Sequence, residues 1–461
     1  MKDISVLWVI LLLGGVGAAH VAPAGITITL GLLLVWSLRG PTECIRSLVL
    51  ATCLTYLNSG IGVLPPEAGI LARVILVVAA ARVLPAMRSR DVPLLWPVWA
   101  FSLVAACLSY ASSSSVSISI MKVITFAVAA STVITAYNSL TPAQISRLQR
   151  WFATVAFVFV VSSLATLAVP RIAFLTNGTG FQGLLNNAQA LAVAMSPLAA
   201  WLFTGLLFLR GKFSLLQGVA LVAVYGALFL SESRTGMASS LIGVAAAALT
   251  WLFSPSRGLV LAGRGRVVAM TLLAILALAG AVATGHLQGT VAKFAFKRAE
   301  SHDVSGAFLE SRGGGALAQW RNFVDQPLLG HGFGVYAQGP PSSSVIEAFG
   351  IPISAPIEKG FVFTAVLEET GILGGLLFFT MLFVLARAVW KNQDLRSVAL
   401  FTSCIAVNIG ECILLAPGGI GLLDWLLIGM AISSSRAAVP LAEVVIPVEP
   451  QEIRFPNLLR S

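Results

Sequence analysis

Residues 361–388 read FVFTAVLEETGILGGLLFFTMLFVLARA, and the only charged residues in this stretch are Glu368, Glu369 and Arg387. A helix that crosses the hydrocarbon core of a bilayer needs about 20 mostly apolar residues, within a range of roughly 17–25. This stretch is long enough and apolar enough for that purpose. It predicts a transmembrane helix that carries a pair of carboxylates.

Similar apolar stretches recur on both sides of residues 361–388. They predict an all-α polytopic integral membrane protein with about 12–14 transmembrane helices and one large periplasmic loop. The stretches at 43–59 and 418–434 are short or interrupted by glycine, so re-entrant segments are an alternative there. The expected spans are 4–20, 23–38, 43–59, 67–84, 93–110, 116–137, 149–169, 187–209, 213–231, 235–253, 266–284, 361–388, 396–413 and 418–434.

The composition agrees with a membrane protein. Of the 461 residues, 57% are hydrophobic and 10% are charged, whereas soluble domains carry roughly 25% charged residues. The net charge of +10 does not indicate nucleic-acid binding, because the basic residues stand singly or in small groups between apolar stretches. We read the five cysteines as small apolar residues, since none has CxxC spacing.

The basic residues also predict the orientation of the chain. Loops on the cytoplasmic side of a membrane are enriched in Lys and Arg. With both ends placed inside, the short outer loops near 21, 60–66, 111–115 and 414–417 hold no Lys or Arg, and every inner segment holds at least one. The inner residues are Lys2, Arg39, Arg46, Arg82, Arg88, Arg90, Arg147, Arg150, Arg210, Lys212, Arg257, Arg264, Arg266, Arg387, Lys391, Arg396 and Arg436.

This topology divides the chain into five parts. We expect N-terminal transmembrane helices over 1–170, helices with outer-face motifs over 171–284, and a large periplasmic loop over 285–360. C-terminal transmembrane helices follow over 361–436, and 437–461 form a cytoplasmic tail. The large loop is the sizeable soluble piece, so it is the natural place for binding or chemistry.

Basic residues on the outer face form the first group of site candidates. Arg234 interrupts an apolar stretch two residues after Glu232. A charge near membrane depth is costly, which makes a functional role our default hypothesis, although an interfacial Arg can also reach lipid phosphates. Arg312 and Arg321 lie nine residues apart in the large loop. Arg suits the two-point binding of phosphate, but ordinary solvated loop charge is the alternative for both.

Acidic residues where the large loop meets the membrane form the second group. Glu358 and Lys359 stand at this junction, and Glu368 and Glu369 follow inside the apolar stretch. Paired carboxylates there indicate an ion pair, a proton relay or a general base, and Glu358 is the preferred base. The alternative is a structural salt bridge.

Other polar residues and motifs complete the outer-face analysis. Lys122 and Arg73 are expected in spans near the outer face, where each adds to a cationic pocket or pairs with a nearby acid such as Glu67 for Arg73. We read Glu411 and Asp424 as polar groups in helix packing. The chain has no HExxH, no Walker phosphate loop and no Asp-x-Asp pair, and its histidines fit no metal site, so we expect neither a metal nor a cofactor. The residues alone indicate a ligand with an anionic head and an apolar tail.

Several outer-face segments resemble the O-antigen ligase and O-antigen polymerase family of bacterial envelope glycosyltransferases, which includes exopolysaccharide polymerases. The resemblance covers roughly residues 177–388. Its segments are SESRTGMASSLIGV at 231–244, WRNFVDQPLLGHGFGVY at 320–336, FVFTAVLEETGILGGLLFF at 361–379 and, more weakly, NGTGFQGLLNNAQALA at 177–192.

The resemblance implies a metal-independent enzyme of the bacterial inner membrane whose active face is periplasmic. Such enzymes transfer a glycan from undecaprenyl pyrophosphate to a glycan acceptor, and a chain-length regulator is a candidate partner. The pyrophosphate-binding role would fall to Arg234, Arg312 and Arg321. We therefore expect Glu358, Arg234 and Arg312 to be catalytic, and the substrate-binding candidates to be Arg321, Lys359, Glu368, Glu369, Trp320 and His331.

One departure from the family bears on the reaction. Ligases of the family carry a His-Asn or similar pair eleven residues before the glycine that corresponds to Gly371, and here that position is Gly360, followed by Phe361. The missing histidine favours polymerisation of surface polysaccharide over ligation to lipid A core. A transporter of lipid-linked glycans and a non-catalytic assembly partner remain alternatives from other classes.

Overall fold

The predicted spans that fall on described residues overlap helices, although several bounds differ. The computed structural model describes residues 23–65, 67–176, 180–208, 215–253, 313–337, 345–348, 351–354 and 359–437, together with Gly14 and Gly17. The predicted spans 4–20 and 266–284, much of the large loop and most of the predicted tail lie outside these residues. So do Arg312 and Glu358.

The described helices follow the order of the predicted spans. They are α2 (Pro23–Ser37), α3 (Pro41–Thr55), α4 (Ala68–Val83), α5 (Val92–Ser112), α6 (Val116–Asn138), α7 (Pro142–Ala165), α8 (Pro170–Ala173), α9 (Ala188–Phe208), α10 (Leu215–Leu230), α11 (Arg234–Leu252), α15 (Gly314–Asp325), α16 (Val362–Trp390), α17 (Leu395–Val407) and α18 (Gly421–Ala437). Short 3₁₀ turns are η1 (Leu84–Ala86), η2 (Ser89–Asp91) and η3 (Thr166–Ala168), and strands β1 (Ile346–Ala348) and β2 (Ile351–Ser354) form an antiparallel hairpin.

The protein is an all-α, multi-pass membrane protein. Seven of its described helices are long and apolar enough to cross a membrane, and three shorter apolar helices accompany them. A helix satisfies its own backbone hydrogen bonds, which is why it is the form that such apolar segments take in lipid. Large apolar side chains such as Leu103, Leu376 and Phe383 are more than half exposed on the outside of the bundle, where lipid would cover them.

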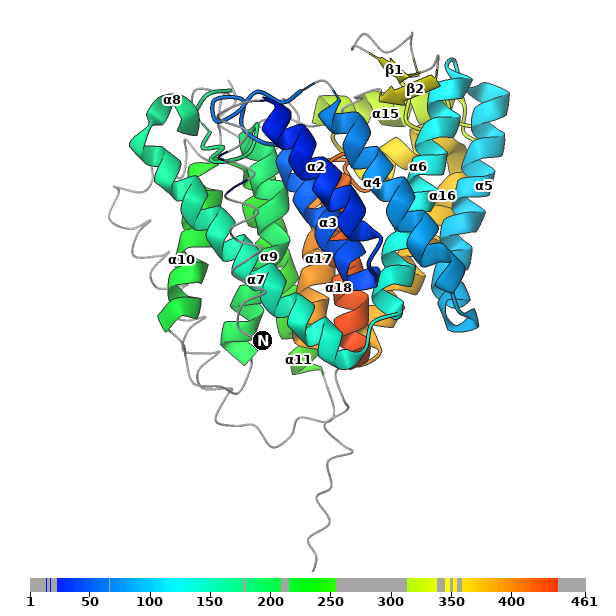
Figure 1. The fold of residues 1–461 in the computed structure, drawn as a ribbon. Helices are drawn as coiled ribbons and strands as arrows, with labels where there is room; N and C mark the ends of the chain where they lie inside the picture. The colour runs from blue at the N-terminus through cyan, green and yellow to red at the C-terminus, as the bar shows by residue number, and fades with distance from the viewer. Residues whose placement is uncertain are drawn as a thin grey trace, which may run out of the picture.

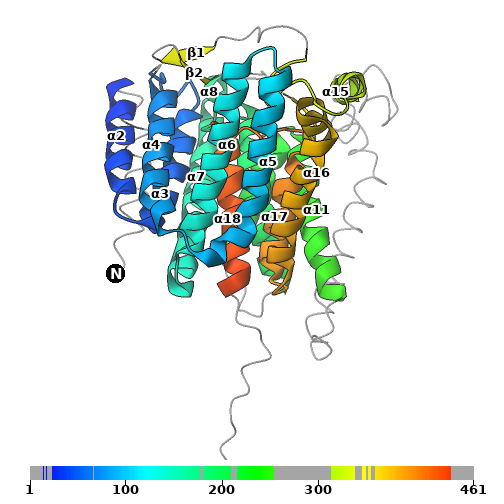
Figure 2. The same ribbon diagram turned by 90° about the vertical axis from the view of Figure 1, so that its right-hand side faces the viewer.

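The two ends of the bundle differ in composition. The long helices run side by side, while α8, α15 and the β1–β2 hairpin lie at one end (Figure 1), and α15 lies across that end, seen along its axis in Figure 2. We call this the hairpin end. At the opposite end, Arg90 and Arg436 both donate to Asn138, to its carbonyl at 2.5 Å and to its Oδ1 at 2.6 Å. Basic residues of the predicted inner loops therefore meet at that opposite end.

Aromatic side chains fill the bundle beneath the hairpin end. Phe101 of α5 and Phe126 of α6 pack edge to face, with ring centroids 5.4 Å apart. Phe378 of α16 and Trp425 of α18 contact this pair from the other side. Phe333, which belongs to the segment after α15, is fully buried between the Phe101 and Phe126 rings. A residue of the predicted loop is thus part of the membrane core.

Three span predictions need correction. The helix expected over 396–413 ends at Val407, and residues 408–420 are not helical, because Asn408 and its neighbours make turns instead. The span expected over 361–388 is one helix by position, but Gly371 interrupts it with non-helical dihedral angles. The span expected at 149–169 begins earlier, since Thr141 caps a helix that starts at Pro142. The span expected at 43–59 corresponds to the 15-residue helix α3, which ends at Thr55.

Candidate functional site

A buried ion triad lies at the start of α16. The ammonium of Lys359 lies 2.8 Å from Glu368 Oε2 and 3.1 Å from Glu369 Oε1, and all three side chains are at most 5% exposed. Burial acts to lower the pKa of Lys359, but the charges of Glu369 and Glu368 outweigh it, so the pKa lies above its ordinary value. Of the three explanations considered for the paired carboxylates, the structure contains the ion pair.

The triad is connected to α15 through an amide. Asn322 donates from Nδ2 to Glu368 Oε1 at 2.7 Å, so both oxygens of Glu368 are engaged. The carbonyl of Asn322 bonds His331 Nε2 at 2.9 Å. Glu369 differs, because its Oε2 is buried with no hydrogen bond within the described chain. His331 therefore contacts the site through the backbone of α15 and not through the acidic side chains.

The break in α16 is filled by the segment after α15. Gly371 has φ 58° and ψ −166°, a conformation that is essentially confined to glycine. The carbonyls of Glu368 and Glu369, which a continuous helix would bond internally, accept instead from the N–H groups of His331 (2.8 Å) and Gly332 (3.0 Å). The Ile372 N–H donates to the Pro327 carbonyl at 2.8 Å. The polar groups that the break exposes are thus satisfied by residues 327–332.

Close packing keeps this segment in place. A Cβ at Gly371 would lie 2.3 Å from the Leu328 carbonyl oxygen, and a Cβ at Gly330 would lie 2.5 Å from the Glu369 carbonyl carbon. Lys122 of α6 donates to the Gly334 carbonyl at 2.6 Å, and Ser109 of α5 accepts from the Phe333 N–H at 2.8 Å. The PLLGHGFG segment at 327–334 is therefore bound to three spanning helices.

A second interruption of the membrane helices lies beside the triad. Residues 408–420 join α17 to α18 without helical structure, and we call them the interhelix loop. Asn408 organises its start: its Oδ1 accepts from the N–H groups of Ile413 and Leu414, and its Nδ2 donates to Cys404 O and to Asp424 Oδ2. The Cys412 N–H donates to the Lys359 carbonyl at 3.0 Å. The loop and the triad therefore form one unit.

Basic side chains of three helices surround the interhelix loop. A Cβ at Gly418 would lie 3.7 Å from Arg73 Nε and 3.9 Å from its Nη2, so one edge of the α4 guanidinium faces the loop. A Cβ at Gly410 would lie 2.2 Å from the hydroxyl of Thr235, the residue after Arg234. Lys122 lies within electrostatic range of Glu369 and Lys359. Arg73 of α4 thus faces the loop, Lys122 of α6 lies within electrostatic range of its Cys412, and the start of α11 contacts the loop through Thr235.

Local structure explains the position of Arg234. The turn before α11 contains Glu232 with φ 53°, and Ser233 caps the helix by accepting from the Gly236 N–H. The Ser231 hydroxyl donates to Leu228 O and accepts from the Ser233 N–H. The SESR sequence therefore builds a tight turn and a helix cap, which places Arg234 at the first position of α11. Arg234 is partly buried there.

The predicted site residues fall into two groups. Lys359, Glu368, Glu369 and the backbone of His331 come together at the break in α16. Trp320 and Arg321 lie elsewhere, on the exposed side of α15, where Trp320 packs on Phe323. Among the residues that the structure describes, no cluster of His, Cys, Asp or Glu could hold a metal ion.

Sequence reasoning missed the residues that organise this region. Asn322 and Asn408 hold the two interruptions together, and Asp424, read as a packing group without a local partner, accepts from Asn408 at 3.0 Å. Arg73 donates from Nη1 to the Gly69 carbonyl instead of pairing with Glu67 within the described chain. The available signal was a polar amide inside an apolar stretch, as at Asn408 in SCIAVNIGECILL.

Comparison with known proteins does not name the family. No protein-family model matches the chain, and no curated protein matches it.

Proposed function

We propose that this protein is a metal-independent glycosyltransferase of the bacterial inner membrane. It would take a glycan from a polyprenyl-pyrophosphate carrier, such as undecaprenyl pyrophosphate, and polymerise surface polysaccharide repeat units. The hairpin end would face the periplasm, because the basic residues of the predicted inner loops gather at the other end. The sequence resemblance to the O-antigen ligase and polymerase family supplies the reaction class.

The observation that carries the proposal is that Arg73 and Lys122 lie beside the interhelix loop at the hairpin end, where Thr235, the residue after Arg234, also contacts it. Within the described chain, the one hydrogen bond of the Arg73 guanidinium uses Nη1, which leaves Nε and Nη2 to face Gly418. Arginine presents parallel N–H groups to phosphate oxygens. A pyrophosphate bound there would be stabilised as it leaves, when its negative charge increases.

The proposed reaction is a direct displacement. A hydroxyl oxygen of the acceptor glycan forms a bond to the anomeric carbon of the donor, while the bond from that carbon to the pyrophosphate oxygen breaks. The polyprenyl pyrophosphate leaves with the bonding electrons, and a carboxylate accepts the hydroxyl proton. Glu358 is the proposed base, since Glu368 and Glu369 are already engaged with Lys359. Arg312 and Arg321 are proposed to complete the anion contacts.

Reconstitution with a defined donor tests the proposal. Purified protein in liposomes would be given a polyprenyl-pyrophosphate oligosaccharide without metal or nucleotide, and product length would be read on a gel. We expect a ladder of multiples that is lost in Arg234→Ala and strongly reduced in Arg73→Ala. The matched control is Arg171→Ala, which removes an exposed arginine from α8 at the same end. Full-length polymer from well-folded Arg234→Ala and Arg73→Ala protein would contradict the site.

Transport of lipid-linked glycans is the second candidate, because interrupted helices beside a binding site are frequent in transporters. The break at Gly371 is an interruption of this kind, and the interhelix loop, a non-helical connection, lies beside it. The same liposomes separate the two functions. Donor that crosses the bilayer without forming product indicates a transporter, whereas a single transfer to an added lipid acceptor indicates a ligase.

A further inference from the structure

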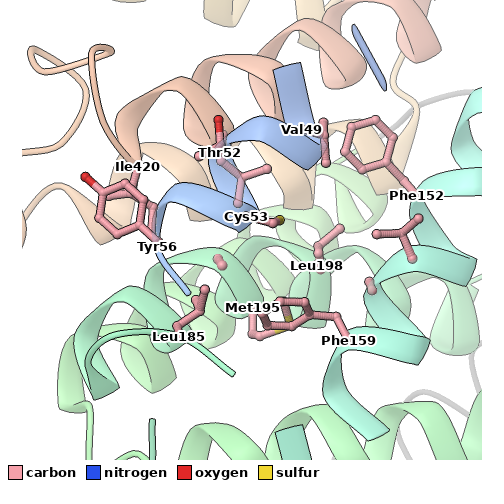
Figure 3. A pocket seen from close by; sticks show the side chains of 14 residues that line it. Val49, Thr52, Cys53, Tyr56, Phe152, Phe159, Leu185, Met195, Leu198 and Ile420 are labelled. Atoms are coloured by element: carbon pink, nitrogen blue, oxygen red, sulfur yellow. The ribbon is translucent and has the colours of Figure 1, made fainter. Parts of the chain in front are cut away.

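A narrow apolar cavity lies inside the bundle next to the interhelix loop. It is enclosed by α3, α7, α9 and the start of α18, and its empty space is about 490 Å³ when its open mouth is included. Figure 3 shows Tyr56 and Ile420 at one end and Val49 and Phe152 at the other. The cavity is separate from the ion triad, and its Tyr56 end lies next to the interhelix loop.

The walls of the cavity are suited to a hydrocarbon. Val49, Thr52 and Cys53 of α3 and the cap residue Tyr56 line it, at the spacing that brings helical residues into a row. The Thr52 hydroxyl donates to the Leu48 carbonyl at 2.8 Å, so it is satisfied within its own helix. The other walls are aliphatic or phenyl groups, apart from the Met195 thioether and the Cys53 thiol. A cavity of this kind offers water few partners and favours an apolar ligand.

The mouth of the cavity is held in shape and is polar on one side. The segment after α3 pairs with residues 184–186: the Asn186 N–H donates to the Tyr56 carbonyl and the Asn58 N–H to the Leu184 carbonyl, both at 2.8 Å. A Cβ at Gly419 would lie 2.3 Å from the Tyr56 hydroxyl, and Arg73 faces the neighbouring Gly418. A ligand that enters past Tyr56 therefore has its head beside a guanidinium and its tail in the apolar cavity.

We propose that this cavity holds the first part of the hydrocarbon chain of an anionic lipid, with the lipid's phosphate beside Arg73. Val49 of α3 and Tyr56, the residue after its last turn, are seven residues apart, which is about 10 Å at a helical rise of about 1.5 Å per residue. The cavity thus takes only the part of the chain nearest the head. The assignment of this chain to the polyprenyl carrier rests on the proposed function, whereas the binding of a lipid chain does not.

Cys53 gives a direct test, because its thiol lines the cavity. The full-length protein in detergent would be treated with N-ethylmaleimide at mildly alkaline pH, and labelling of each cysteine would be followed by peptide mass spectrometry. With a long-chain polyprenyl phosphate at about ten times its Kd, roughly one-tenth of the protein is unoccupied, so Cys53 labelling should slow about tenfold. The exposed Cys107 of α5 is the internal control, and its labelling should not change.

The probes separate the sources of the ligand. Inorganic pyrophosphate should leave Cys53 labelling unchanged, because it lacks the chain. Equal protection by phosphatidic acid would support a lipid-chain site without preference for the polyprenyl carrier, and would overturn the assignment to that carrier. The cavity proposal would be overturned if Cys53 were labelled as fast with each lipid as without lipid. It would also be overturned if Cys53 reacted with no reagent while Val155→Phe bound lipid normally.

A pair of matched variants gives the second readout. Val155→Phe fills the cavity from α7, whereas Val161→Phe makes the same change on the exposed side of the same helix. We expect Val155→Phe to weaken binding of radiolabelled polyprenyl phosphate at least tenfold and Val161→Phe to leave it unchanged. Lipid binding without any glycan product would overturn the proposed function and leave the lipid-binding cavity supported. Polymer formation by Val155→Phe at normal KM would overturn the lipid-binding cavity and leave the proposed function supported.

Discussion

The two interruptions of the membrane helices solve the same problem in different ways. In both, a break leaves backbone groups that lipid cannot bond. At Gly371 the groups are satisfied by the backbone of a distant segment, residues 327–332. After Val407 they are satisfied by short-range backbone bonds and by the Asn408 side chain, which bonds two N–H groups. The first break therefore depends on the large loop for its stability, whereas the second is bonded mainly within itself, with a further bond from Cys412 to Lys359.

The largest expected effect is on the first break. Gly371→Ala costs about 1–3 kcal/mol for the backbone conformation alone, and a Cβ 2.3 Å from the Leu328 carbonyl oxygen adds a clash with backbone atoms to that cost. We expect loss of the monodisperse protein on size exclusion in detergent. Gly226→Ala is the control, because it lies in α10 with open space around its Cβ position. A folded Gly371→Ala protein with normal thermal stability would show that the break is not fixed by its backbone.

The second-largest loss of stability is expected when the triad cation is removed. Lys359→Met leaves two buried carboxylates without their cation, and breaking a buried pair in this way costs about 3–5 kcal/mol. Thermal unfolding in detergent measures the loss. The combined variant Lys359→Met, Glu368→Gln and Glu369→Gln should recover much of that loss, since it removes the unpaired charge. No recovery would mean that packing, and not charge, is what Lys359 contributes.

The second break should be less sensitive to a single change. Asn408→Ala leaves the Leu414 N–H without its hydrogen-bond partner and removes one bond each from the Ile413 N–H and the Asp424 carboxylate. A buried unsatisfied group costs about 1–3 kcal/mol, and relaxation of the loop should limit the total to about 3 kcal/mol. Hydrogen exchange should increase in residues 408–420 and remain unchanged in 327–332. Equal exchange in both segments would show that the two breaks are not independent.

The smallest expected difference is between the two glutamates. Glu368→Gln disturbs both a lysine contact and the Asn322 bond, whereas Glu369→Gln changes a side chain with one free oxygen within the described chain. We expect Glu368→Gln to lower stability by about 1–2 kcal/mol and Glu369→Gln to be close to neutral, because the triad holds one more carboxylate than it has cations. Thermal unfolding of the two variants, compared side by side, decides the order.

The apolar stretches predicted the helices well, and they predicted the two breaks poorly. Hydropathy is a local property, so residues such as those of α6 and α9 could be placed from composition alone. The dihedral angles of Gly371 depend on Leu328, which lies 43 positions earlier in the sequence. The sequence GILGG is compatible with a continuous membrane helix. The helix is interrupted at Gly371 where residues 327–332 pack against it. The interhelix loop was predicted too short, near 414–417 instead of 408–420, because its apolar residues resemble those of a span.

The candidate site could be predicted in part for the same reason. Lys359 and the two glutamates stood out because charges are rare in apolar sequence, and their closeness along the chain made an ion pair a natural expectation. Asn408 and Asp424 are 16 positions apart, on either side of the interhelix loop, and no sequence pattern predicts that they form a hydrogen bond. The partners of Arg73 and Lys122 are backbone carbonyls, which no side-chain pattern reveals.

The order of the triad along the chain has a consequence for biosynthesis. Lys359 precedes Glu368 by nine residues, and residues 327–332 precede both. A chain made from its N-terminus therefore produces the cation and the covering segment before the carboxylates leave the ribosome. The two glutamates can then be neutralised as their helix enters the bilayer, so the insertion machinery handles an already paired segment.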